Sequence, residues 1–408
     1  MPDTNLARDA APQVSPRVTT GDALGFTVAL LAVSLLLQRL ALPLGGGGIS
    51  LTLPLGLGLI GFGVMRGTLT LHRGRLLAFL ALVALVLLGF AWRAAGAAGP
   101  SLPSMLQFLL LSAAAVVSFA QPIGQRRFFR TVNQCLLLIA AAGLLQFAAQ
   151  FIGLRLFSFA GLLPDWLLFE QGYNLQIPAG IGDLLKSNGF FLVEPSVFSQ
   201  MMALGLMIEG LTTRRLRNLA MFAAGLLVSF SGTGWLVLAA FVVAVPFRLG
   251  VRGLGLAVAL VVVAAGAAGL LILLAPDIAA AFAGRLDEVL RPGTSGHLRF
   301  VTPFWMLSDV IAADPAAALV GIGGGLAERQ TLAYEYDVNT PVKIAVEYGL
   351  PALFAYLLLF TWAARTKVQS ALLVPVLVLF LFTGGYQQFP PIVFVVLLLT
   401  VMARLKQE

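Results

Sequence analysis

Apolar runs separated by short polar connections dominate this chain. Most of the runs come close to the ~20 residues that an α-helix needs to cross the hydrocarbon core of a bilayer. The continuous runs are Ala23 to Leu42, Ile49 to Met65, Leu76 to Trp92, Pro103 to Ala120, Thr131 to Ile152, Pro195 to Leu211, Gly253 to Ala275 and Pro341 to Ala364. The pattern predicts an all-α, polytopic integral membrane protein.

Two longer apolar stretches contain polar interruptions, and each predicts two helices around a turn. Residues 219–247 are interrupted at 229–234 by the sequence SFSGTG. Residues 370–405 are interrupted at 384–391 by GGYQQFPP, and glycine and proline are strong helix breakers. With these two breaks we predict about twelve transmembrane helices.

The basic residues predict an orientation for these helices, because Lys and Arg collect in cytoplasmic loops. If residues 1–22 form a cytoplasmic tail, the short basic connections at 66–75, 121–130, 212–217, 248–252 and 365–367 all fall on the cytoplasmic side. The chain then divides into transmembrane helices at 23–152, 195–275 and 341–408, the last ending in a short cytoplasmic tail, with two large periplasmic loops at 153–194 and 276–340. We therefore expect a multi-pass protein of a bacterial inner (plasma) membrane, with both termini cytoplasmic.

Composition supports the membrane interpretation and changes the meaning of the charge. The 408 residues are 59% hydrophobic and 11% charged, whereas soluble domains are about 25% charged. The excess of 26 Lys and Arg over 18 Asp and Glu would suggest nucleic acid as the partner of a soluble domain, but the positive-inside rule explains it here, so we expect no nucleic acid. Cys135 is the single cysteine and can form no internal disulfide.

The first large loop ends in a polar cluster that leads directly into an apolar run. Glu194 stands before Pro195, and proline is favoured in the first helical turn. Glu194 is either an acidic helix cap or a carboxylate at the lipid–water boundary that binds or deprotonates a sugar hydroxyl. Lys186 belongs to the same cluster.

The second large loop contains basic side chains on the side of the membrane where the charge bias disfavours them. These are Arg285, Arg291, His297, Arg299 and Arg329. Arginine presents a planar fork of donors that matches phosphate oxygens, although ion pairing with neighbouring carboxylates is an equal alternative for any one of them. Arg299 is the strongest candidate, because it follows the flexible sequence GTSG at 293–296.

Other signals point away from nucleotides and metals. The glycine-rich segment 321–325 lacks the strand-before, helix-after context of a nucleotide site, so we interpret it as a tight turn. No metal-ligand spacing is present, and we expect no cofactor.

Four segments together resemble the O-antigen polymerase and ligase superfamily, in particular its Wzy-like exopolysaccharide-polymerase branch. Residues 188–196, NGFFLVEPS, resemble the family's helix-opening G-x-F-x-E-P-S, and residues 229–234 its serine-rich turn, although Gly232 stands where many members have Arg. Arg299, Trp305, Pro315 and the GIG at 321–323 are similar to the large-loop pattern. Asn339–Thr340 through Pro351 resembles the motif H-N…G-L-P-G, but Val338 replaces the histidine of the ligases, which favours the polymerase branch.

The resemblance implies a metal-independent glycosyltransferase on the periplasmic face. It would join polyprenyl-diphosphate-linked oligosaccharide repeat units in exopolysaccharide biosynthesis, alongside a flippase and a chain-length regulator of the same pathway. Arg299 would hold the departing diphosphate, together with Arg285, Arg291, Arg329 or Lys186. Glu194, His297, Asp337 and Glu347 would orient or deprotonate the acceptor hydroxyl.

Three other functions stay open at this point. A ligase-type glycan transferase would use the same donor. A flippase or exporter of lipid-linked oligosaccharides would place its cations in a central membrane cavity. A non-catalytic membrane subunit of a secretion complex would not bring the external Arg and Glu residues together in one pocket.

Overall fold

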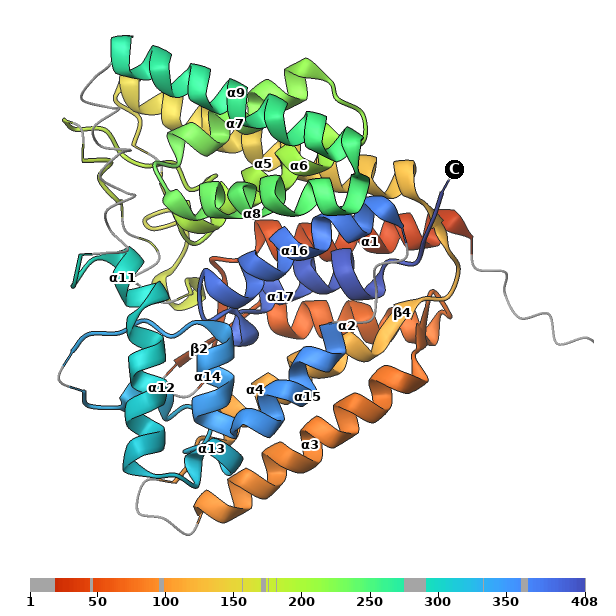
Figure 1. The fold of residues 1–408 in the computed structure, drawn as a ribbon, viewed down its shortest axis with the longest axis vertical. Helices are drawn as coiled ribbons and strands as arrows, with labels where there is room; N and C mark the ends of the chain where they lie inside the picture. Colours follow the sequence, from red (N-terminus) through yellow and green to blue (C-terminus); the bar gives the residue numbers. More distant parts are fainter. Residues whose placement is uncertain are drawn as a thin grey trace, which may run out of the picture.

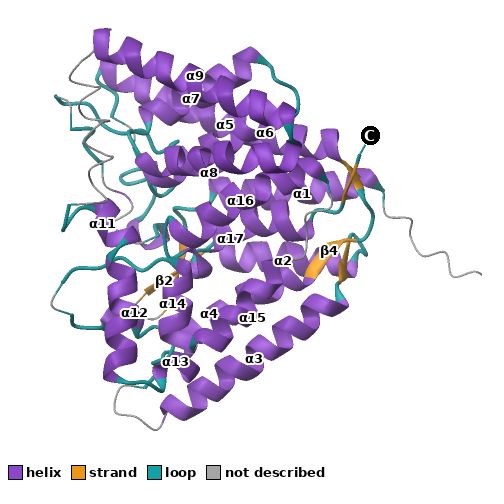
Figure 2. Cartoon of the chain, viewed as in Figure 1, coloured by secondary structure: helices purple, strands orange, loops and turns teal. Residues whose placement is uncertain are grey.

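The computed structural model describes residues 19–44, 47–94, 99–155, 157–169, 174, 176–180, 182–274, 291–332, 334–360 and 366–407. Helices make up most of this part of the chain, which confirms the all-α prediction (Figure 2). The N-terminal helices are α1 (Thr20–Leu36), α2 (Thr52–Met65), α3 (Arg73–Ala94), α4 (Leu102–Ala113) and α5 (Gln125–Ala149). The central helices are α6 (Pro195–Leu211), α7 (Leu216–Val228), α8 (Gly232–Leu249) and α9 (Val251–Leu274). The C-terminal part contains α11 (Ser295–Phe300), α12 (Thr302–Ala313), α13 (Ala317–Val320), α14 (Thr340–Tyr348), α15 (Leu350–Phe360), α16 (Lys367–Phe382) and α17 (Pro390–Leu397).

Three helices among the described residues are long and apolar enough to cross a membrane. They are Arg73–Ala94, Gln125–Ile152 and Gly232–Leu249. Most of the remaining apolar helices are shorter than the ~20 residues of a full span. The length and composition of three helices therefore support membrane insertion.

The helices form a layered bundle with the connecting loops at two ends (Figure 1). Helices α5 to α9 pack together as one group, and α16 packs against α8. Helices α11 to α14 lie together along one edge of the molecule, and the C-terminus lies at the opposite edge (Figure 1). At that opposite edge β5 (Ile123–Gly124) pairs in parallel with β6 (Leu405–Lys406).

Short strands occur only in connections within the described residues. β1 (Ala41–Leu44) and β2 (Gly47–Ser50) form one antiparallel pair, and β3 (Leu69–Leu71) pairs with β4 (Val117–Phe119). These pairs correct two predicted spans. The run from Ala23 ends as a helix at Leu36, and the run from Pro103 ends as a helix at Ala113 before it continues into a 3₁₀ turn and β4. Apolar composition alone does not distinguish these strand residues from helix.

The predicted helix breaks at 229–234 and 384–391 are present. The first separates α7 from α8, and the second separates α16 from α17. A third break was not predicted: the run from Pro341 to Ala364 divides at Gly349, which has a φ of 87°. An added Cβ at Gly349 would meet the Leu319 carbonyl oxygen at 2.3 Å, so only glycine fits there.

The second large loop is docked onto the bundle where the structure describes it. Arg93, near the end of α3, donates from Nε to the Gly321 carbonyl at 2.7 Å and lies 2.6 Å from Asp314 through Nη2. The backbone N–H groups of Ile322 and Gly323 bond the carbonyls of Val346 and Glu347 in α14. The glycine-rich segment is therefore a tight turn against α14, which is the interpretation made from the sequence.

Candidate functional site

Arg299 lies between two carboxylates from different segments of the chain. Its Nε donates to Asp337 Oδ2 at 2.8 Å, and its Nη2 lies 3.9 Å from Glu194 Oε2. The side chains of Arg299, Glu194 and Asp337 are 23%, 31% and 45% exposed, so a ligand can reach all three. Burial lowers the pKa of Arg299, but the charges of Asp337 and Glu194 outweigh this effect and leave the pKa above its usual value. The guanidinium is therefore a permanent cation, and its side chain is partly exposed.

Glu194 occupies the N-cap position of α6 without acting as a side-chain cap. Its backbone is extended, and its carboxylate forms no capping hydrogen bond. Instead Oε2 accepts a hydrogen bond from the Ser196 hydroxyl at 2.6 Å. Glu194 therefore occupies the N-cap position, as one interpretation of the sequence expected, but its carboxylate contacts Ser196 and lies near Arg299 instead of capping the helix.

Backbone and side-chain bonds fasten α11 to the segment that precedes α14. The Asp337 N–H donates to the Leu298 carbonyl at 3.1 Å, and Asn339 Nδ2 donates to the Arg299 carbonyl at 3.4 Å. The Oδ1 atom of Asn339 caps α14 by accepting from the Val342 N–H at 3.1 Å. Asn339 thus holds the backbone of Arg299, and the backbone bond of Asp337 to Leu298 holds the other partner of the Arg299–Asp337 pair.

The serine-rich turn packs against the beginning of α6, directly behind Glu194. Thr233 donates through Oγ1 to the Ser196 carbonyl at 3.1 Å, and the Gly234 N–H donates to Ser199 Oγ at 3.1 Å. A Cβ at Gly234 would lie 2.5 Å from the Ser199 carbonyl oxygen, so glycine permits this close approach. The turn therefore supports the helix end that presents Glu194.

Tyr386 completes the cluster and was missed in the sequence. Its hydroxyl accepts from Gln200 Nε2 at 3.0 Å, and Gln200 Nε2 also reaches Thr383 Oγ1 at 3.1 Å. Burial raises the pKa of Tyr386 to about 12, with the Arg299 charge lowering it and the Glu194 charge raising it. The phenol is therefore a neutral hydrogen-bonding group beside the two charges. The polar sequence YQQ inside a helix break was the signal that could have identified it.

His297 and Glu347, both predicted site residues, form no hydrogen bond or ion pair with Arg299, Glu194 or Asp337 in the described part of the chain. The His297 ring packs edge-on against Trp305, with 5.3 Å between ring centroids, and its Nδ1 has no hydrogen-bond partner in the described chain. Glu347 is 1% exposed and lies eight residues after Asn339, roughly 12 Å along α14 at a rise of 1.5 Å per residue. Glu347 is therefore not grouped with Arg299, because α14 carries it to the other end of the helix.

The other predicted diphosphate ligands are more scattered than the sequence suggested. Arg329 is exposed in a short 3₁₀ turn (Ala327–Arg329), and Arg291 is exposed before α11. Lys186 is half-buried in the first loop, where its N–H bonds the Ile177 carbonyl. Arg285 lies outside the described residues.

A second arginine supports the site from behind. Arg39 is fully buried and donates from Nε to the Leu192 carbonyl at 2.8 Å and from Nη2 to the Val193 carbonyl at 3.4 Å. Its Nη1 donates to Asn174 Oδ1 at 3.1 Å. Arg39 therefore fixes the two residues that precede Glu194. The sequence did not reveal this role, because Arg39 lies inside the apolar run from Ala23 to Leu42 that we predicted to be a transmembrane helix.

Comparison with known proteins does not identify a family or a function for this cluster of residues. No protein-family model matches the chain, and no curated protein matches it.

Proposed function

We propose that this chain is a glycosyltransferase of the bacterial inner membrane that joins polyprenyl-diphosphate-linked oligosaccharide repeat units on the periplasmic face. The observation that carries the proposal is the cluster of Arg299 between Glu194 and Asp337. Glu194 and Arg299 come from two of the family-like segments, Asp337 lies two residues before a third, and the serine-rich turn packs behind Glu194. These three residues are close together in space and partly exposed, which supports the interpretation that the segments form one site.

The proposed topology has about twelve spans with both termini cytoplasmic. Its support is the set of short basic connections, together with the position of the chain's C-terminal strand at the edge opposite α11 to α14 (Figure 1). The cluster would then lie at the periplasmic boundary, where lipid-linked donors present their diphosphate.

The proposed chemistry is a displacement at the anomeric carbon of the donor. The bond between that carbon and the diphosphate oxygen breaks, and a bond to the acceptor hydroxyl oxygen forms. The Nη groups of Arg299 bind the diphosphate as it gains negative charge, an interaction that a partly buried site strengthens. The hydroxyl proton passes to a carboxylate. Glu194 is the better acceptor because Asp337 is already bonded to Arg299 at 2.8 Å, whereas Glu194 stands 3.9 Å away.

The excess of carboxylates in the cluster supports this division of roles. Two carboxylates face one guanidinium, so the cluster contains one more carboxylate than the guanidinium can neutralise. A site that only bound diphosphate would gain nothing from the second carboxylate. A transferase needs it to accept the proton.

A lipid-linked oligosaccharide flippase is the second candidate, and the break between α14 and α15 favours it. Broken helices with ionisable residues are typical of transporter sites. Buried Lys343 and Glu347 lie on α14, and Lys343 forms an ion pair with Glu328. A ligase-type transfer to a different acceptor uses the same site chemistry as the polymerase.

Reconstitution of the full chain in vesicles distinguishes these functions. The vesicles contain a polyprenyl-diphosphate oligosaccharide of a single length. A polymerase produces oligosaccharides of twice that length or more and releases polyprenyl diphosphate. A flippase moves the substrate across the bilayer without changing its length, and that result would contradict the proposal.

A further inference from the structure

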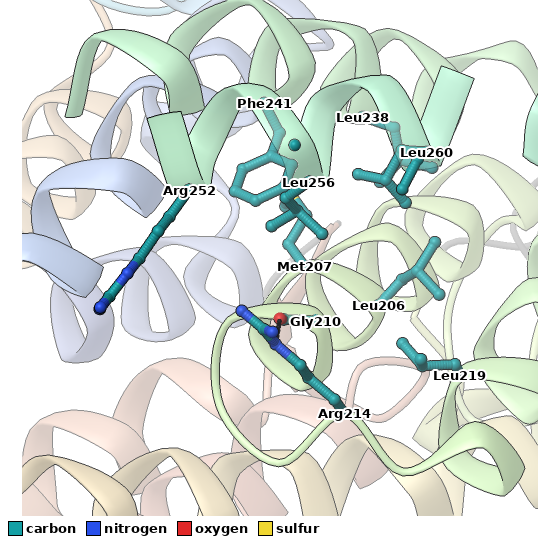
Figure 3. Close-up of a pocket in the computed structure, with 12 residues that line it drawn as sticks. Leu206, Met207, Gly210, Arg214, Leu219, Leu238, Phe241, Arg252, Leu256 and Leu260 are labelled. Atoms are coloured by element: carbon teal, nitrogen blue, oxygen red, sulfur yellow. Dashed lines mark hydrogen bonds between the residues drawn. The ribbon is translucent and has the colours of Figure 1, made fainter. Parts of the chain in front are cut away.

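A pocket of about 530 Å³ lies at the opposite end of α6 from Glu194. Residues of α6, α7, α8 and α9 line it (Figure 3). Helix α6 has 17 residues, so its two ends are separated by roughly 25 Å at 1.5 Å per residue. The pocket is therefore separate from the Arg299 cluster.

The pocket has a basic mouth and an apolar interior. Figure 3 shows Arg214 and Arg252 toward one side and the side chains of Leu206, Leu238 and Leu260 toward the other. None of the lining residues is acidic. The nearby carboxylate of Glu209 is already bonded to Asn133, Asn218 and the Arg215 N–H. The two arginines therefore face the pocket without a competing anion among its lining residues.

Backbone geometry holds one of these arginines at the mouth. Arg214 has a φ of 54°, a left-handed conformation that is uncommon for a residue other than glycine. Its N–H bonds the Glu209 carbonyl at 2.8 Å, and its Nε donates to the Gly210 carbonyl at 3.1 Å. The guanidinium is thus folded back over the end of α6, while Arg252 approaches from α9.

The surroundings of the pocket match the chemistry of a bilayer. The neighbouring face of α9 exposes apolar side chains, with Val251 86% exposed and Val262 63% exposed. Apolar surface of this kind is stable in lipid rather than in water. The molecule with an anionic headgroup and an apolar chain that is always present beside such a surface is an anionic phospholipid.

We propose that this pocket binds an anionic phospholipid, with the headgroup phosphate between Arg214 and Arg252 and one acyl chain against Leu206, Leu256 and Leu260. The inference is independent of the transferase proposal and requires only that these helices lie in a membrane. Under the proposed topology the lipid belongs to the cytoplasmic leaflet, whose surface attracts basic residues.

Native mass spectrometry of the full chain in detergent tests the proposal, with phosphatidylglycerol and phosphatidylcholine of the same chain length as probes. Wild-type protein is expected to retain phosphatidylglycerol in preference to phosphatidylcholine. A basic residue near a membrane surface strengthens anionic lipid binding about fivefold, so Arg214→Gln with Arg252→Gln should weaken retention about twenty-fivefold. Arg217→Gln is the matched control, because Arg217 is exposed on α7 but does not line the pocket.

A second variant blocks the pocket without touching its charge. A Cβ at Gly255, which lines the pocket, would meet no atom within 4 Å, so Gly255→Leu extends a side chain from a position that has room for its first carbon. It should abolish phosphatidylglycerol retention, whereas Gly266→Leu on the same helix, also free of contacts, should retain the lipid.

Several results would overturn the assignment. Equal retention of the two lipids would show that the arginines do not recognise the headgroup. Unchanged retention in Gly255→Leu would show that the lipid binds outside this pocket. Displacement of the lipid by an equal concentration of inorganic phosphate would reduce the site to an anion site. A lipid-independent dimer that Gly255→Leu disrupts would assign the pocket to a second copy of the chain.

Discussion

The guanidinium Nη2 of Arg299 lies 3.9 Å from Glu194 Oε2, and the same guanidinium is bonded through Nε to Asp337 at 2.8 Å. One cation is thus shared unequally between two carboxylates. The unequal sharing assigns different roles to the two acids in the proposed transfer, and those roles can be separated by substitution.

Glu194→Gln should reduce polymer formation by at least roughly a hundredfold, because a general base contributes about 10²- to 10⁴-fold. Asp337→Asn should cost less, about tenfold, because asparagine can still accept the Nε–H bond and only its charge is lost. Turnover of purified variants in vesicles measures both. Ser196→Ala is the control, since it removes one hydrogen bond to Glu194 and keeps the carboxylate. A larger loss in Asp337→Asn than in Glu194→Gln would reverse the assignment.

The sequence predicted the segments of this site better than the contacts within it. Glu194 was identified because it stands directly before an apolar run, and Arg299 because it is a basic residue of an external loop that follows a flexible sequence. Asp337 was identified only through the family resemblance. The separation of Glu347 from Arg299 could not be predicted, because the break at Gly349 and the end of α14 depend on tertiary contacts with Leu319 and Gly321. Arg39 was missed because a single polar residue among apolar ones has no local pattern that shows what it contacts. Tyr386 was missed because its polar sequence YQQ was interpreted only as a helix break.

The pattern of apolar residues predicted two of the helix breaks correctly, but it did not predict where several helices end. Glycine and proline marked the breaks at 229–234 and 384–391, since they act through local backbone geometry. Strand residues such as Val117–Phe119 remained indistinguishable from helix, because an apolar run has the same composition in either form.

Tyr386 should make stability depend on pH above about 10. Its pKa rises from 10 to about 12 in the folded protein. Between these values the folded state holds the proton and the unfolded state releases it, so the stabilisation is complete below pH 10 and is lost as the pH rises toward 12. The full loss is about 3 kcal/mol, because each pKa unit corresponds to about 1.4 kcal/mol. Thermal unfolding of wild type and Tyr386→Phe at pH 9, 10 and 11 measures it, and a Phe variant with the same slope as wild type would exclude Tyr386 as the cause.

Gly321→Ala should prevent the second loop from docking. Gly321 has a φ of 70°, and a Cβ there would lie 2.2 Å from the Glu347 carbonyl oxygen. Left-handed strain and overpacking together cost ~2 kcal/mol or more. The level of folded protein in membranes is the measurement. Gly99→Ala, where a Cβ meets nothing within 4 Å, should accumulate normally, and equal levels of the two variants would contradict the packing argument.

Cysteine labelling tests the proposed orientation. With Cys135 replaced by alanine, Thr294→Cys should react with an impermeant thiol reagent added outside the cell. Arg217→Cys should react only after the membrane is opened. Gln171, another predicted external position, lies outside the described residues. Labelling of Arg217→Cys in intact cells, or protection of Thr294→Cys, would invert the topology and move the Arg299 cluster to the wrong face.

Polymer length in cells that produce Arg299 variants at matched membrane levels is the most direct test of the account. Arg299→Ala should leave unpolymerised lipid-linked repeat units, since one charge-assisted contact to a developing anion is worth about 3 to 4 kcal/mol, or a hundred- to a thousandfold in rate. Arg299→Lys should restore only short chains, because an ammonium keeps the charge but loses the two-pronged geometry. Normal ladders of long chains from Arg299→Ala would contradict the central claim.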